Sequence, residues 1–186
     1  MKTGMNRSAV LMLSLAAMVM SDMAVAKHRG DNTVLIGGAI SMTGRYSEPA
    51  GRNLNSIKLW VEDVNKRGGL LGHTVKIKYL DDKSDKQTSI KIYEKLITDD
   101  KVDLLLSPWG TSLHFAIVGV IERYKFPVVG NTAASVQLRD IKAGNIWFPT
   151  SAFPDRQSTE LAKLLKSQGV STAALITNQL PYTQEN

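Results

Sequence analysis

The sequence contains no cysteine and few aromatic residues, and each shortage excludes a class of protein. Without cysteine the chain forms no disulfide and carries no lipid on a cysteine, so its stability depends on an ordinary hydrophobic core. Aromatic residues make up 6% of the chain, whereas a nucleic-acid surface needs them for stacking beside clustered lysine and arginine. The net charge is +6, but the basic residues alternate with acidic ones, as on solvated helix faces. We therefore expect no nucleic-acid partner.

No apolar run is long enough to span a bilayer, which takes about 20 residues in a helix. The longest run, residues 9–20, follows Lys2 and Arg7 and precedes the small residues Ala24-Val25-Ala26. A basic start, a short apolar run and a small-x-small site are typical of an export signal. We expect residues 1–26 to be a signal peptide that is cleaved after Ala26, and the mature chain to be periplasmic.

Motifs that would hold a cofactor or a metal ion are missing or are better explained as turns. Five residues separate Gly38 from Gly44, which fits neither the dinucleotide pattern nor the Walker pattern. Asp81, Asp82 and Asp85 have the spacing D-D-x-x-D, but they lie between a strand and a helix, where Asp85 is a natural helix cap. No pair of histidines has the spacing of metal ligands. We therefore predict no cofactor and no metal.

Apolar patterns alternate between strands and helices along the rest of the chain. Runs rich in β-branched residues predict strands at 33–40, 74–80, 102–106, 127–130, 145–150 and 171–177. Apolar residues at helical spacing predict helices at 49–66, 86–98, 112–125 and 155–168. Repeated strand-helix-strand units require right-handed crossovers. The predicted fold class is α/β, a doubly wound, Rossmann-like parallel sheet with helices on both faces.

Three of the predicted strands end in loops of glycine, serine and threonine, at residues 41–44, 107–112 and 131–135. Ligands of open parallel sheets bind beyond the carboxyl ends of the strands. Ser112 stands where a helix N-cap is expected, so the backbone N–H groups that follow it would favour a carboxylate. The alternative is that Thr111 and Ser112 only cap their own helix. Trp109, in the same loop, could cover a ligand with its ring.

Five segments, in this order, resemble the type I periplasmic solute-binding proteins of ABC transporters, of the leucine/isoleucine/valine and amide class. The segments are residues 38–44, 64–72, 80–85, 110–112 and 131–135. The resemblance implies two lobes that close on an amino acid, amide or related small carboxylate and hand it to permease subunits in the membrane. Residues 27–150 would form the first lobe, and residues 151–186 a crossover helix and the start of the second.

The resemblance also implies which residues bind the ligand. The loop 109–112 would hold the carboxylate, the loop 133–135 would lie beside it, and two tyrosines would line the first loop and the hinge side of the second lobe. The residues at these positions are Tyr46, Trp109, Gly110, Thr111, Ser112, Ala133, Ala134, Ser135 and Tyr182.

Two other functions are compatible with this fold class. An exported hydrolase would use Ser112 or Ser135 as nucleophile, but residues 110–114 read G-T-S-L-H and lack the second glycine of G-x-S-x-G. A ligand-sensing module would use the same fold to report a solute instead of transporting it. Members of the family are about twice as long as this chain, so we expect it to be a fragment or a truncated form.

Overall fold

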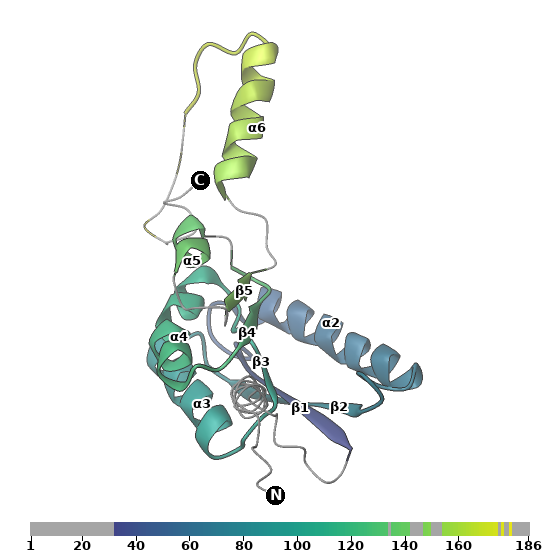
Figure 1. The fold of residues 1–186 in the computed structure, drawn as a ribbon. Coiled ribbons are helices and arrows are strands. Elements are labelled where there is room, and N and C mark those ends of the chain that lie inside the picture. The colour runs from purple at the N-terminus through teal and green to yellow at the C-terminus, as the bar shows by residue number, and fades with distance from the viewer. Residues whose placement is uncertain are drawn as a thin grey trace, which may run out of the picture.

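A computed structural model describes residues 32–133, 135–141, 147–149, 154–174, 176 and 179 (Figure 1). Its strands are β1 (Thr33–Ile40), β2 (Thr74–Asp81), β3 (Leu104–Leu106), β4 (Val128–Gly130) and β5 (Trp147–Pro149). Its helices are α2 (Ser47–Lys66), α3 (Lys86–Thr98), α4 (Thr111–Tyr124), α5 (Val136–Asp140) and α6 (Pro154–Ser167). The strands form one parallel sheet in the order β2-β1-β3-β4-β5. The predicted α/β fold class is confirmed.

Helices lie on both faces of the sheet, as predicted, whereas α6 stands away from it (Figure 1). The connection through α2 leads from β1 to its neighbour β2, whereas the connections through α3 and α4 lead in the opposite direction across the sheet. Because crossovers are right-handed, a reversal of direction places the connecting helix on the opposite face. Accordingly α2 packs on one face of β1 and β2, and α3 and α4 pack together on the other.

The larger core lies between the sheet and the pair α3 and α4. Leu105 at the centre of β3, Leu96 of α3 and Ile117 of α4 each expose 1% of their surface or less. Burying a leucine or isoleucine side chain contributes about 1.5–3 kcal/mol. Two smaller clusters on the other face pack Val64 of α2 against Ile36 of β1 and Leu54 of α2 against Ile40 of β1. Together these cores hold the central strands in place.

The buried faces of α3 and α4 differ from those predicted. In α4 the spacing of three residues between Phe115, Val118 and Ile121 indicates one apolar face in the sequence, but the buried apolar residues are Leu113, Ile117, Val120 and Ile121. A step of three residues drifts around a helix that has 3.6 residues per turn, whereas steps of four, three and one stay on one face. In α3 the spacing of Ile90, Tyr93 and Ile97 indicates an apolar face in the sequence, but the buried apolar residues are Ile92, Tyr93 and Leu96.

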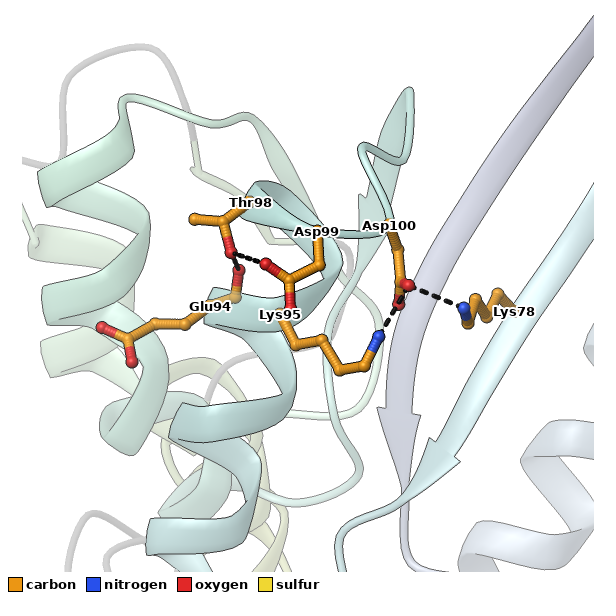
Figure 2. A network of polar contacts seen from close by, with 6 residues as sticks. All are labelled: Lys78, Glu94, Lys95, Thr98, Asp99 and Asp100. Carbon is orange, nitrogen blue, oxygen red and sulfur yellow. Dashed lines mark hydrogen bonds and ion pairs between the residues drawn. The ribbon is translucent and has the colours of Figure 1, made fainter.

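A network of polar contacts ties the end of α3 to the edge strand β2 (Figure 2). The carboxylate of Asp100 accepts from Lys78 Nζ at 2.8 Å and from Lys95 Nζ at 2.7 Å, and its side chain is 10% exposed. These two hydrogen bonds hold the pKa of Asp100 below its ordinary value. Both lysines remain more than one third exposed, so solvent screens the pair and its contribution to stability is small.

The predicted strand at 171–177 is wrong. Residues 171–174 and 176 have no strand structure, and Val170 and Ile176 are exposed. A strand is stable only beside a partner that accepts and donates its backbone hydrogen bonds, and the sheet of the described residues ends at β5. The short helix α5 was not predicted, because five residues are too few to show a helical period. None of the described helices is both long and apolar enough to cross a bilayer.

Candidate functional site

The loops that follow β1, β3 and β4 meet at the carboxyl edge of the sheet, as predicted, because these three strands are adjacent and parallel. The β3 and β4 loops are bonded to each other. Ser107 Oγ donates to Asn131 Oδ1 at 3.2 Å, and Thr132 Oγ1 donates to the carbonyl of Pro108 at 2.8 Å. The same Thr132 oxygen accepts from the backbone N–H of Gly110 at 3.3 Å. These hydrogen bonds therefore hold the two loops together next to the N-terminus of α4.

Helix α4 begins one residue earlier than predicted, and its N-cap is Gly110. The prediction that Ser112 is the N-cap is wrong, since Ser112 is the second residue of the helix and no side chain caps it. Gly110 has φ 91° and ψ 143°, a backbone conformation that only glycine adopts readily. Glycine thus makes the sharp turn from the β3 loop into the helix, and the hydroxyls of Thr111 and Ser112 are not used as caps.

The first turn of α4 has unused hydrogen-bonding groups. Thr111 and Ser112 are only 7% and 6% exposed. Their backbone N–H groups have no acceptor within the described part of the chain, and their hydroxyls have no partner there either. Unpaired N–H groups at a helix N-terminus carry partial positive charge and bind anions. The groups at this position can hold a carboxylate.

An aromatic pair stands beside this helix end. The rings of Tyr46 and Trp109 have centroids 5.3 Å apart and planes inclined by 48°. The Arg45 guanidinium lies 4.5 Å from the centre of the Tyr46 ring. A β-carbon built on Gly110 would lie 3.9 Å from Tyr46 Cε2, so the tyrosine ring also adjoins the N-cap of α4. The structure therefore brings together Tyr46 and the loop 109–112, which were predicted from separate segments.

The structure describes two of the four remaining predicted site residues, Ala133 and Ser135. Ser135 is fully buried and is the N-cap of α5, where its Oγ accepts from the N–H of Leu138 at 3.3 Å. Ala133 is 6% exposed. Ala134 and Tyr182 lie outside the described residues.

Two residues near the site were not singled out in the sequence. Thr132 joins the β3 and β4 loops, although it lies within a loop that had been recognised. His114 is fully buried in the first turn of α4, and its Nδ1 donates to the carbonyl of Gly110 at 2.9 Å. Burial lowers the pKa of His114 from 6.5 to about 4, and the bond to Gly110 opposes this change only in part. In the sequence, the only indication of this contact was that His114 follows Gly110 by four residues, which is about one turn of a helix.

The three aspartates between β2 and α3 have structural roles, as interpreted from the sequence, although Asp81 is the last residue of β2 instead of a turn residue. Asp85 is the N-cap of α3, and its carboxylate accepts from the N–H of Thr88 at 2.7 Å. Asp81 and Asp82 also accept backbone N–H groups of the turn, those of Lys83 and Ser84, each at 2.9 Å. Within the ranges that the structure describes, no three histidine or acidic residues are arranged to hold a metal ion.

A cavity of about 270 Å³ lies between α2 and the sheet and reaches the β4 loop at Asn131. Its lining contains no residue of the α4 N-terminus and neither member of the aromatic pair. The lining residues are Ile36, Asn53, Ser56, Ile57, Trp60, Leu106 and Asn131.

Comparison with known proteins agrees with this fold. A solute-binding protein of an ABC transporter from Rhodopseudomonas palustris, solved with 3,4-dihydroxybenzoic acid, is 19% identical with a TM-score of 0.73, over 83% of this chain and 41% of that one. A second R. palustris protein, solved with 4-hydroxybenzoate, is 22% identical with a TM-score of 0.70, over 82% and 40%. A branched-chain amino acid binding protein from Streptococcus pneumoniae, solved with isoleucine, is 21% identical with a TM-score of 0.60, over 65% and 34%.

The chain spans less than half the length of these three solved proteins. The family model described as periplasmic binding protein matches residues 33–186, which is most of the chain. The match begins after the export segment predicted from the sequence and includes all the loops at the carboxyl edge of the sheet. This chain belongs to the periplasmic binding protein family.

Proposed function

We propose that this chain supplies the carboxylate-binding side of the solute-binding component of an ABC importer. The observation that supports it most directly is the free N–H pair of Thr111 and Ser112 beside the Tyr46 and Trp109 rings. The solute would be an amino acid, an amide or a related small carboxylate. The component would act in the periplasm after cleavage at Ala26, and it would deliver the solute to permease subunits in the membrane.

The solutes bound by the similar proteins support this ligand class. Isoleucine, 3,4-dihydroxybenzoic acid and 4-hydroxybenzoate share a carboxylate and differ in the rest of the molecule. A helix N-terminus recognises the shared group, and neighbouring side chains distinguish the remainder. The tilted aromatic pair offers ring faces beside the carboxylate position, which favours a ring-bearing acid over an aliphatic one.

The domain boundaries inferred from the sequence are part of the same proposal. Residues 27–150 would form the first lobe, and residues 151–186, including α6, would lead into a second lobe that covers the ligand. One lobe contacts only one side of a solute, so we expect affinity no better than about 1 mM for this chain, equivalent to about 4 kcal/mol. The chain lacks the nucleophile motif G-x-S-x-G, and its family binds solutes, so binding is favoured over hydrolysis.

The first prediction is that 4-hydroxybenzoate binds at the α4 N-terminus of this chain. Amide chemical shifts measured by NMR detect weak binding and assign it to residues. With ligand up to about 10 mM, the largest shifts should fall on Thr111, Ser112 and the Trp109 indole N–H, with smaller shifts for isoleucine. Benzyl alcohol, which has the ring without the carboxylate, should cause none at the helix end. Shifts that are absent or spread over the surface would contradict the proposal.

The second prediction concerns the Ser112 hydroxyl. Ser112→Ala should weaken binding by about 1–3 kcal/mol if this hydroxyl donates to the ligand carboxylate, because the bond is made to a charged group. The matched control is Ser167→Ala in α6, an exposed residue whose hydroxyl bonds to the carbonyl of Leu164 within its own helix. The same NMR titration compares the proteins at equal ligand concentration, and the weakened variant should show clearly smaller shifts at the helix end. Equal affinities of Ser112→Ala and the unmodified chain would exclude a role for this hydroxyl.

A further inference from the structure

The turn that follows β2 is hydrogen-bonded to the loop that follows β1, and Asp81, at the end of β2, makes several of these bonds. Asp81 Oδ1 accepts the backbone N–H groups of Met42 at 2.9 Å, Thr43 at 3.2 Å and Lys83 at 2.9 Å. Its Oδ2 accepts from Thr43 Oγ1 at 2.7 Å. Burial acts to raise the pKa of Asp81, but these four bonds outweigh it and hold that pKa below 3.8. The carboxylate is therefore charged at neutral pH, and its bonds are charge-assisted.

A second carboxylate fixes the same turn from inside the protein. Asp82 is fully buried, and its Oδ1 accepts from Ser41 Oγ at 2.6 Å and from the N–H of Ser84 at 2.9 Å. Its Oδ2 accepts from Ser89 Oγ of α3 at 3.4 Å. Asp82 thus links the end of β1, the turn after β2 and helix α3 at one point. The turn is anchored to the core and is not a free surface loop.

Ser84 connects the anchored turn to Tyr46, one member of the aromatic pair. Its Oγ donates to the carbonyl of Thr43 at 3.0 Å and accepts from the backbone N–H of Tyr46 at 3.1 Å. Lys83 and Ser84 both have positive φ angles, 55° and 59°, which non-glycine residues rarely adopt. A β-carbon on Gly44 would lie 2.7 Å from Ser84 Oγ, so the two loops are in close contact. The strained turn places the hydroxyl against the backbone that carries the Tyr46 ring.

We propose that Asp81, Asp82 and Ser84 are positioning residues that hold loop 41–46 so that the Tyr46 ring stays against Trp109 beside the α4 N-terminus. None of the three needs to touch the ligand. The proposal rests on the proposed function for its effect on binding, but not for its effect on the two rings. Because Ser84 is the member in direct contact with Tyr46, its hydroxyl is the group to remove.

Ser84→Gly removes the hydroxyl and its hydrogen bonds. Glycine also adopts the positive φ at this position without strain, which offsets part of the lost stability of the folded chain. The matched control is Lys83→Gly, which relieves the neighbouring positive φ and keeps every bond of Ser84 and Asp81, since Lys83 contributes only its backbone N–H. Ser84→Ala is the second variant, because it lacks the hydroxyl but keeps the β-carbon.

The experiment measures nuclear Overhauser contacts between the Tyr46 and Trp109 rings in the ligand-free chain, together with the affinity for 4-hydroxybenzoate. Ser84→Gly and Ser84→Ala should lose most of the ring contact and bind about 3- to 10-fold more weakly, whereas Lys83→Gly should retain both. Unchanged ring contacts in both Ser84 variants would overturn the proposal, as would equal losses in Lys83→Gly. If the unmodified chain binds no carboxylate, the proposed function fails, while the ring contacts still decide the positioning role.

Discussion

Gly110→Ala is expected to destabilise the chain by about 1–3 kcal/mol, although there is room for the added methyl group. The nearest atom to a β-carbon at this position is Tyr46 Cε2, at 3.9 Å, so no steric clash is responsible. The cost comes from the backbone, because φ 91° with ψ 143° is a conformation that alanine avoids. If the backbone relaxes instead, the N–H groups of Thr111 and Ser112 turn away from their present direction, and carboxylate binding weakens with them.

The control for this prediction lies in the same helix. Gly119 is exposed in the middle of α4, and a β-carbon built on it meets nothing within 4 Å. Gly119→Ala should stabilise the chain by about 0.5–1 kcal/mol, because alanine loses less backbone entropy than glycine in a helix. Urea unfolding of the two variants and the unmodified chain gives both differences. A Gly110→Ala protein as stable as the unmodified chain would show that the turn before α4 tolerates other residues.

Most of the fold could be predicted from the sequence, because it depends on local patterns that the core then preserves. The run 33–40 became β1 with the predicted bounds, and α2 ends at Lys66 as predicted, before Gly68 and Gly69 with their positive φ angles. The faces of α3 and α4 could not be read correctly. Each helix packs against both the sheet and its neighbour in the larger core, so its buried face depends on where that neighbour lies.

The candidate site was predictable only in part. Its position at the carboxyl edge follows from parallel strand order, which the alternation of strands and helices establishes. The contact of Tyr46 with Trp109, 63 positions later in the chain, depends on hydrogen bonds between loops that no local pattern encodes. Ser112 was misread as the N-cap because serine is a common cap, whereas here the required backbone angles select Gly110. The family resemblance predicted the position of the loop, but only the structure shows which residue is the N-cap of α4.

The second large effect is a loss of stability in mild acid that depends on His114. This side chain is fully buried, and its pKa falls from 6.5 to about 4 because burial disfavours the charged ring. The unfolded chain therefore binds a proton more readily than the folded chain between these two values. The stabilising contribution is complete above about pH 6.5 and is lost as the pH falls towards about 4, amounting to about 3 kcal/mol in total.

The free energy of unfolding, measured with urea, should be about 2 kcal/mol lower at about pH 5 than at about pH 7 because of His114 alone. Other titrating groups add their own effect. His114→Gln retains a donor for the carbonyl of Gly110 but does not titrate, so its decrease should be smaller by that amount. Comparing the decrease within each protein removes any difference in their stability at neutral pH. Parallel decreases in the two proteins would mean that His114 is not held neutral by burial. A smaller decrease in the variant would show that the neutral His114 ring stabilises the chain in a pH-dependent way. This ring lies in the first turn of α4, which also contains Thr111 and Ser112.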